Sequence, residues 1–377
     1  MKRFCLLATI CLFLCLSIIK GIDTPVCAEG FESCASSMIL MEQTTGRVLA
    51  EKNADQQRSI ASTTKILTCL TVLENCQDLE RIVKINKNYV GVEGTSIYLK
   101  EGENLTVKDL LYGLMLRSGN DAATALAYEI AGDIPSFAKL MNQTAKKYGA
   151  QNCNFENPHG LESANHHCSA RELANITRHA LSNERFAEIV SAKSYKVQTR
   201  ENSTPRSFQN KNKLLFRFDG ATGVKTGFTK KAGRCLVSSA QRNGLKLVCV
   251  VLNCGPMFEE SEQLFEDAFN KYSMRELVEP YSTCGTVDVI KGEVEEVEVF
   301  TMKGFSYPLS EEEYQQVKIE YDYPSSIQAP LKKESIIGKV KIKLNNDLLF
   351  EENVYTIKEV KSPLIKSGIK DFIDKWF

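Results

Sequence analysis

One serine and one lysine, three residues apart at the start of a strongly apolar stretch, constrain the fold of this chain more than any other feature. Ser62 and Lys65 precede apolar residues at helical spacing, namely Ile66, Leu67, Leu70 and Leu73. Serine is favoured where a helix begins, and side chains three residues apart share one helix face. The sequence therefore predicts a helix that begins at Ser62 and holds its hydroxyl beside the Lys65 ammonium.

The chemistry of this pair is that of a nucleophile and a base. A serine hydroxyl attacks poorly until a neighbouring group accepts its proton. A lysine can accept it if burial or a nearby positive charge lowers the pKa of the amine toward neutrality. Many exposed helices begin in the same way, however, so Ser62 and Lys65 alone do not indicate catalysis.

Two later motifs contain groups that suit the same site. Ser118 and Asn120 lie in a predicted loop between two helices, where the tripeptide alone would indicate only a turn. Lys225, Thr226 and Gly227 lie on the edge strand of a predicted antiparallel sheet. The three motifs S-x-x-K, S-x-N and K-T-G are found together in penicillin-binding proteins and class A β-lactamases.

On these motifs, the chain resembles the low-molecular-weight penicillin-binding proteins of the D-alanyl-D-alanine carboxypeptidase type, which are S11 serine peptidases. The resemblance is specific from about residue 35 to residue 272 and looser beyond. It implies an α/β (α+β) fold, in which helices flank the antiparallel sheet of a β-lactamase/transpeptidase-like domain. It also implies an enzyme that removes the terminal D-alanine of peptidoglycan stem pentapeptides through an acyl-enzyme on Ser62. Such enzymes need no cofactor, and β-lactams inhibit them covalently.

The resemblance implies a catalytic role for four side chains. Ser62 attacks the carbonyl between the two D-alanines, and Lys65 takes the Ser62 proton. Ser118 relays a proton to the leaving D-alanine. Asn120 holds the peptide amide and helps to orient Lys65. The choice of Lys65 as the base is a preference, because the acylation base is disputed for related enzymes.

The same resemblance implies a substrate-binding role for the third motif and the residue that follows it. Lys225 supplies a positive field, and Thr226 binds the terminal carboxylate of the substrate. Gly227 lets another part of the backbone approach closely. The backbone amides of Ser62 and Phe228 form an oxyanion hole, and losing one such donor typically costs ~10²–10³ in rate.

Other activities remain open for these motifs. A D,D-endopeptidase would cut crosslinks instead of stem ends, and a non-catalytic sensor would bind β-lactams or wall peptides without turnover. A β-lactamase is disfavoured because class A enzymes use a glutamate in a Glu-x-x-Leu-Asn setting, whereas Glu172-Leu173-Ala174-Asn175 has a different spacing. His166-His167-Cys168 invites a metal site, but no C-x-x-C or H-E-x-x-H motif occurs in the sequence, so we predict no metal.

The sequence predicts four segments. Residues 1–28 form a secretory signal with cleavage after Ala28, the alternatives being a later cut at Ser33-Cys34-Ala35 or retention as a membrane anchor. Residues 29–275 form the peptidase domain. Residues 276–362 alternate apolar and polar side chains and form a small β-sandwich-like domain. Residues 363–377 form an amphipathic helix that lies on a membrane surface or, alternatively, docks on its own domain.

These segments predict a protein outside the cytoplasm, held peripherally on the outer face of the cell membrane. The formal net charge is zero, so no nucleic-acid partner is expected. Removal of the signal leaves 9 of the 13 cysteines, an odd number without a C-x-x-C pair. We therefore predict that most cysteines are free apolar core residues and that no disulfide framework exists.

Overall fold

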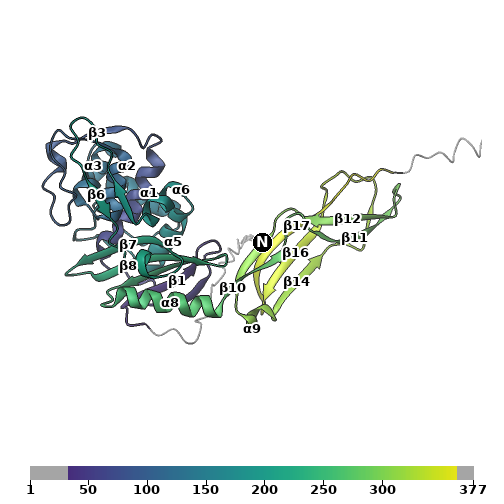
Figure 1. Ribbon diagram of the computed structural model, residues 1–377. Coiled ribbons are helices and arrows are strands. Elements are labelled where there is room, and N and C mark those ends of the chain that lie inside the picture. Colours follow the sequence, from purple (N-terminus) through teal and green to yellow (C-terminus); the bar gives the residue numbers. More distant parts are fainter. Residues whose placement is uncertain (1–32, 363–377) are drawn as a thin grey trace, which may run out of the picture.

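The computed structural model describes residues 33–362, which form a helix-and-sheet part followed by an elongated β part (Figure 1). The first part is built on a five-stranded antiparallel sheet with the order β2-β1-β9-β8-β7. Its strands are β1 (Ser37–Glu42), β2 (Val48–Lys52), β7 (Ala221–Thr229), β8 (Gly233–Arg242) and β9 (Leu245–Leu252). Strand β7, which carries the third motif, lies at the edge, as predicted.

Helices cover both faces of this sheet, because its strands alternate apolar side chains toward both sides. Leu40 packs in the cluster that contains helix α8 (Met257–Lys271), whereas Ile39 packs in a larger cluster with the remaining helices. Helix α5 (Ala170–Leu181) lies on β1 and β9, and α6 (Glu184–Ser191) lies on β7. The predicted arrangement of helices around an antiparallel sheet is confirmed.

The remaining helices contribute their apolar side chains to the larger cluster, except that Leu214 packs in the cluster that contains α8. They are α1 (Lys65–Asn75), α2 (Val107–Leu116), α3 (Asn120–Ala131), α4 (Ile134–Lys147) and the short α7 (Leu214–Arg217). Short elements connect them: η1 (Ala61–Thr64), η2 (Lys87–Tyr89), β3 (Ile82–Lys84), β4 (Asn104–Thr106), β5 (Ser194–Lys196) and β6 (Ser207–Gln209). Thr106 caps α2, since its side chain accepts a hydrogen bond from the amide of Asp109.

The prediction that a helix begins at Ser62 is wrong in detail. Residues Ala61–Thr64 form a 3₁₀ turn, and α1 begins at Lys65. The hydroxyls of Thr63 and Thr64 donate to the carbonyls of Ile60 (2.6 Å) and Ala61 (2.8 Å). Each of these bonds joins a hydroxyl to the carbonyl three residues earlier and tightens the first turn. Ser62 therefore lies on a turn in front of the helix.

The part from Ser273 onward is almost entirely β, in agreement with the predicted alternation. Its main sheet has six strands in the order β14-β16-β17-β12-β11-β15, and β10 pairs with β13. The elements are β10 (Ser273–Val278), β11 (Thr283–Ile290), β12 (Glu296–Thr301), β13 (Phe305–Leu309), α9 (Glu311–Tyr314), β14 (Val317–Asp322), β15 (Ser326–Gln328), β16 (Ile336–Leu344) and β17 (Asp347–Thr356). The short helix α9 was not predicted.

Two predicted segments, the signal of residues 1–28 and the amphipathic helix of residues 363–377, lie outside the described residues. Between residues 33 and 362, no helix has the length and apolar character needed to cross a bilayer. The nine cysteines in this range are free, as predicted. Cys69, Cys168, Cys235 and Cys249 are fully buried, which is the environment expected of cysteines that act as small apolar residues.

Candidate active site

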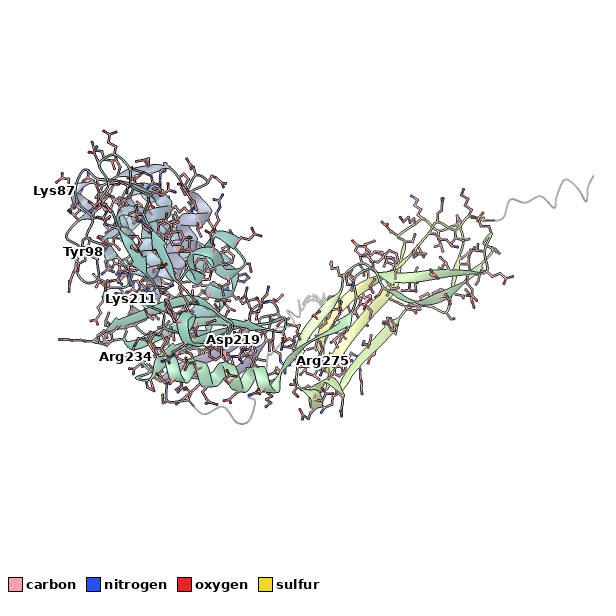
Figure 2. All side chains as sticks on the ribbon, in the orientation of Figure 1. Lys87, Tyr98, Lys211, Asp219, Arg234 and Arg275 are labelled. Carbon is pink, nitrogen blue, oxygen red and sulfur yellow. The ribbon has the colours of Figure 1, made fainter. Side chains whose placement is uncertain are left out.

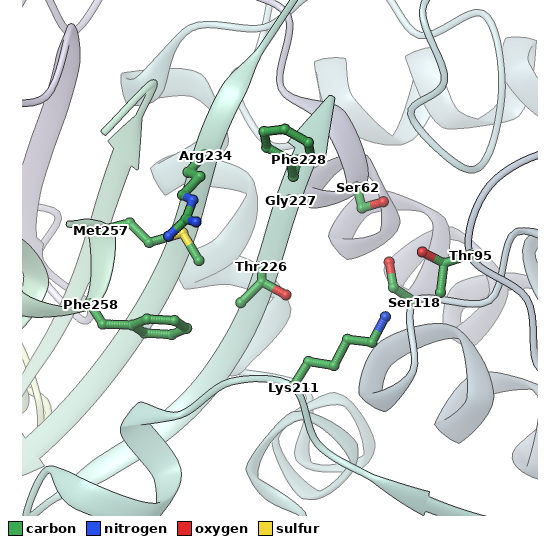
Figure 3. Close-up of a pocket in the computed structure, with 10 residues that line it drawn as sticks. All are labelled: Ser62, Thr95, Ser118, Lys211, Thr226, Gly227, Phe228, Arg234, Met257 and Phe258. Atoms are coloured by element: carbon green, nitrogen blue, oxygen red, sulfur yellow. The ribbon is translucent and has the colours of Figure 1, made fainter. Parts of the chain in front are cut away.

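A cleft of about 390 Å³ lies between the edge strand β7, the turn η1 and the loop that joins α2 to α3. Figure 3 shows Ser62, Ser118 and Thr226 around it, each from a different one of these elements. Gly227 and Phe228 also line the cleft. Three segments that are far apart in the sequence therefore meet around one hydroxyl.

Lys65 lies directly behind Ser62 and is fully buried. Its Nζ lies 3.0 Å from Ser62 Oγ, 2.8 Å from Asn120 Oδ1 and 2.6 Å from the carbonyl oxygen of His159. The last two atoms can only accept hydrogen bonds. A neutral amine has two N–H donors for them and one lone pair, which is then available for the Ser62 O–H.

The electrostatic surroundings favour this neutral amine. Burial lowers the pKa of Lys65 well below its ordinary value, and the nearby charges of Lys225 and Lys211 lower it further. Burial likewise lowers the pKa of Lys225 to about 7, with a further contribution from Lys211. Lys225 is itself buried, and its ammonium donates to the carbonyl of Thr226 (2.9 Å).

Asn120 is the first residue of α3 and is fixed at both ends of its amide. Its Oδ1 accepts from Lys65, its Nδ2 donates to the carbonyl of Glu93 (2.6 Å), and its backbone amide donates to the carbonyl of Thr95 (2.7 Å). This network leaves only the oxygen of the side-chain amide facing Lys65. Ser118, two residues earlier, is buried and adopts a left-handed backbone conformation (φ +64°), which is uncommon for serine.

Gly227 brings β7 against the turn that carries Ser62. A Cβ added at this glycine would lie 3.1 Å from the carbonyl oxygen of Ile60 and 3.1 Å from the backbone nitrogens of Ser62 and Thr63. Few Cβ atoms lie this close to backbone atoms, so a side chain here would push the turn away by a few tenths of an ångström. The predicted close approach at Gly227 is thereby explained, and it sets Phe228 beside Ser62 at the mouth of the cleft (Figure 3).

Five residues that the sequence analysis did not name also line the cleft: Thr95, Lys211, Arg234, Met257 and Phe258. Lys211 is the most informative, because its ammonium points toward Ser118 (Figure 3). It is held by the run Asn210-Lys211-Asn212, in which the Asn210 side chain accepts from the amide of Asn212 (2.9 Å). A cation between two turn-forming asparagines was the signal available in the sequence.

Among residues 33–362, two groups of thiol and carboxylate side chains have donor atoms within 4.8 Å of one another, which is close enough to hold a metal ion. One contains Cys34, Cys254 and Glu260, and the other contains Cys153, Cys168 and Glu172. Neither group lines the cleft. His166 belongs to neither, and its ring nitrogens bond to Thr64 and to the amide of Glu156.

Comparisons with known proteins agree with this geometry. Residues 24–255 match the model of the D-alanyl-D-alanine carboxypeptidase family, Peptidase S11, and residues 272–362 match the model of the C-terminal domain of penicillin-binding protein 5. The chain is 31% identical to the D-alanyl-D-alanine carboxypeptidase DacF of Bacillus subtilis, over 91% of this chain and 90% of the relative. It is also 31% identical to DacC of Escherichia coli, over 91% and 89%. Penicillin-binding protein 5 of Haemophilus influenzae has a similar structure, with a TM-score of 0.74, 28% identity, and coverage of 89% of this chain and 100% of that one.

Proposed function

The chain belongs to the D-alanyl-D-alanine carboxypeptidase family, Peptidase S11, and we propose that Ser62, Lys65, Ser118 and Asn120 carry out its reaction. It is a serine hydrolase that acts on peptidoglycan stem peptides ending in D-Ala-D-Ala, and it is a penicillin-binding protein. The endopeptidase and sensor alternatives are not favoured by these relatives.

In the first step, Ser62 Oγ attacks the carbonyl between the two D-alanines. The 3.0 Å contact from Lys65 Nζ to Ser62 Oγ carries this assignment, since both remaining N–H groups of a neutral amine are taken by acceptors. The serine proton therefore passes to Lys65. The backbone amides of Ser62 and Phe228 stabilise the oxyanion. The close packing of Gly227 on the turn supports this pairing.

In the second step, the leaving D-alanine takes a proton and departs. Ser118 Oγ is the relay, because Ser118 lines the cleft together with Ser62. Lys211 and Thr226 hold the terminal carboxylate of the substrate, and the buried Lys225 adds positive field behind them. Water then hydrolyses the acyl-enzyme and restores Ser62.

The direct test is release of D-alanine from a stem pentapeptide by the purified protein. Wild type should release D-alanine, and Ser62→Ala should not. Lys65→Arg should put a permanently charged group in place of the neutral amine, remove the base and slow acylation by ~10²–10⁴. Equal release by wild type and Ser62→Ala would contradict the role of Ser62. Intact-mass measurement after addition of benzylpenicillin should show one adduct on wild type and none on Ser62→Ala.

We further propose that the enzyme acts outside the cytoplasm, on the outer face of the cell membrane. Residues 1–28 would direct export, and residues 363–377 would hold the mature protein to the membrane surface. The relatives are cell-wall enzymes, which supports the first of these roles. A variant truncated after residue 362 should leave the membrane fraction while keeping its D-alanine release. Unchanged membrane partition would contradict the anchor.

A further inference from the structure

The substrate cleft contains two unpaired cations at different ends. Lys211 lies beside Ser118, whereas Arg234 lies across β7, beside Met257 and Phe228 (Figure 3). Neither side chain forms an ion pair or a hydrogen bond with any other group among residues 33–362. The acidic residues nearest in sequence to Met257 have other partners, because Glu259 pairs with Arg217 and Glu260 accepts from Cys34.

The D-Ala-D-Ala dipeptide can pair with only one of these two cations. D-Ala-D-Ala carries a single carboxylate, at its end, and the proposed function places it against Lys211 and Thr226. Lys211 is the cation of this pair that acts on the buried lysines, because its charge lowers the pKa of Lys65 and of Lys225. Arg234 therefore remains available for a second negative charge on the substrate.

The direction of the bound peptide decides where that charge lies. The terminal carboxylate lies near Thr226 and the scissile carbonyl lies near Ser62 and the amide of Phe228. Thr226 and Phe228 are two residues apart along β7, a distance of roughly 6.6 Å. The peptide upstream of the scissile bond therefore continues past Phe228, which is the direct cross-strand partner of Arg234.

We propose that Arg234 binds a carboxylate on the side chain of the stem-peptide residue that precedes D-Ala-D-Ala. The enzyme then prefers stems with a diamino-dicarboxylic acid at this position over stems whose side chain there ends in an amide or an amine. The proposal rests on the proposed function and deepens it by naming the preferred class of stem peptide.

The surroundings of Arg234 suit such a contact. Phe228 is 65% exposed, and together with Met257 and Phe258 it gives the cleft an apolar wall beside the guanidinium. A peptide bound along this wall would exclude water from the ion pair. The guanidinium of Arg234 can bind both oxygens of a carboxylate. The backbone of Arg234 is held in place, because its carbonyl accepts a hydrogen bond from the amide of Cys254 (2.9 Å). An ion pair that is only partly shielded from solvent should change kcat/KM by about three- to tenfold.

The test compares two pentapeptides that differ in one group. Both contain diaminopimelate before D-Ala-D-Ala, with its side-chain carboxylate free in one peptide and amidated in the other. Wild type should show a kcat/KM for the free acid about three- to tenfold above that for the amide. Arg234→Gln should lower kcat/KM for the free acid alone and so bring this ratio to about one. Arg234→Lys should keep part of the preference. Lys230→Gln, which removes an exposed cation from the nearby turn, should leave the ratio unchanged.

The possible failures are distinguishable. If wild type releases D-alanine from neither peptide, the proposed function fails. If wild type cleaves both peptides and Arg234→Gln slows both equally, Arg234 binds the terminal carboxylate or supports the fold, and the inference is wrong. A ratio of one in wild type also overturns it. A second measurement needs no variant: the ratio of the two kcat/KM values of wild type is compared with and without 0.5 M salt. Because salt screens an ion pair, the ratio should fall toward one in 0.5 M salt.

Discussion

His166 Nε2 lies 2.8 Å from Thr64 Oγ1, in the turn that also carries Ser62. The Nδ1 atom of His166 accepts a hydrogen bond from the amide of Glu156 (3.2 Å), so the proton of the neutral ring is on Nε2 and is donated to Thr64. Thr64 in turn donates to the carbonyl of Ala61 (2.8 Å). Ala61 has a left-handed backbone (φ +48°) immediately before Ser62. A chain of three hydrogen bonds thus supports the strained residue next to Ser62.

This arrangement predicts that His166 makes the fold sensitive to acid. Burial lowers the pKa of His166 to about 4, from an ordinary value of 6.5. Between these values the unfolded chain binds a proton that the folded protein does not, so stability is full above pH 6.5 and falls as the pH falls toward 4. The loss attributable to this ring is roughly 3 kcal/mol. Urea unfolding of wild type and His166→Gln at pH 7.0, 5.5 and 4.5 measures the free energy of unfolding, which should decrease less with falling pH in the variant.

His167 provides the control for this measurement. Its ring is only partly buried, and His167→Gln should retain the wild-type slope. His159 keeps its own contribution in both variants, because burial lowers its pKa to about 3. Parallel curves for wild type and His166→Gln would show that the ring of His166 is not the source of the acid sensitivity.

Removal of Lys211 should move the pH dependence of acylation. Its ammonium lowers the pKa of both Lys65 and Lys225, in addition to the larger effect of burial. In Lys211→Gln the protonated form of Lys65 is therefore less disfavoured, and its pKa rises. The acid limb of the acylation profile should shift upward by roughly 0.5–1 pH unit. Stopped-flow acylation by a fluorescent penicillin between pH 5 and 10 would measure it, with Lys213→Gln as the control for a nearby charge outside the cleft. Coincident acid limbs would contradict the coupling.

The proposed catalytic groups could be named from the sequence because each lies within a short motif. Ser62 and Lys65 are three residues apart, so helical geometry alone puts them side by side. The three motifs predicted that Ser62, Ser118 and Thr226 meet, and all three line the cleft. The sequence pattern did not reveal the 3₁₀ turn, which depends on the hydroxyls of Thr63 and Thr64. Apolar alternation was sufficient to predict the β character of the chain after Ser273.

The residues that support or extend the site could not be found in this way. His166 reaches Thr64 across 102 positions of sequence, and the apparent metal motif His166-His167-Cys168 drew attention to the wrong chemistry. Arg234 has no distinguishing neighbours in sequence, and its place in the cleft depends on the register that pairs it with Phe228. Such contacts are decided by tertiary packing, on which local patterns carry no information.

Gly227 should tolerate no side chain, because a Cβ there would press on backbone atoms of the catalytic turn. Gly227→Ala would put a methyl group 3.1 Å from the amide nitrogens of Ser62 and Thr63, and backbone can yield only by moving the turn. Acylation by benzylpenicillin should slow by ~10²-fold, the cost of misplacing a reacting group. Gly255→Ala is the matched control, since no atom lies within 4 Å of its added Cβ. Similar acylation rates in the two variants would rule out the packing role of Gly227.

Cys34 is exposed, yet it should react with alkylating agents more slowly than an ordinary exposed cysteine. Its thiol donates to Glu260 Oε2 (3.1 Å), and this hydrogen bond is the largest of the effects that raise the pKa of Cys34. Glu260→Gln removes the negative acceptor, so the pKa should fall and more thiolate should be present at pH 8. A fall of one pKa unit would give roughly ten times more thiolate while the thiol is mostly protonated. Iodoacetamide labelling followed by peptide mass spectrometry should detect faster modification of Cys34, with Glu262→Gln unchanged. If Glu260→Gln and wild type are labelled at the same rate, the hydrogen bond does not control the thiol.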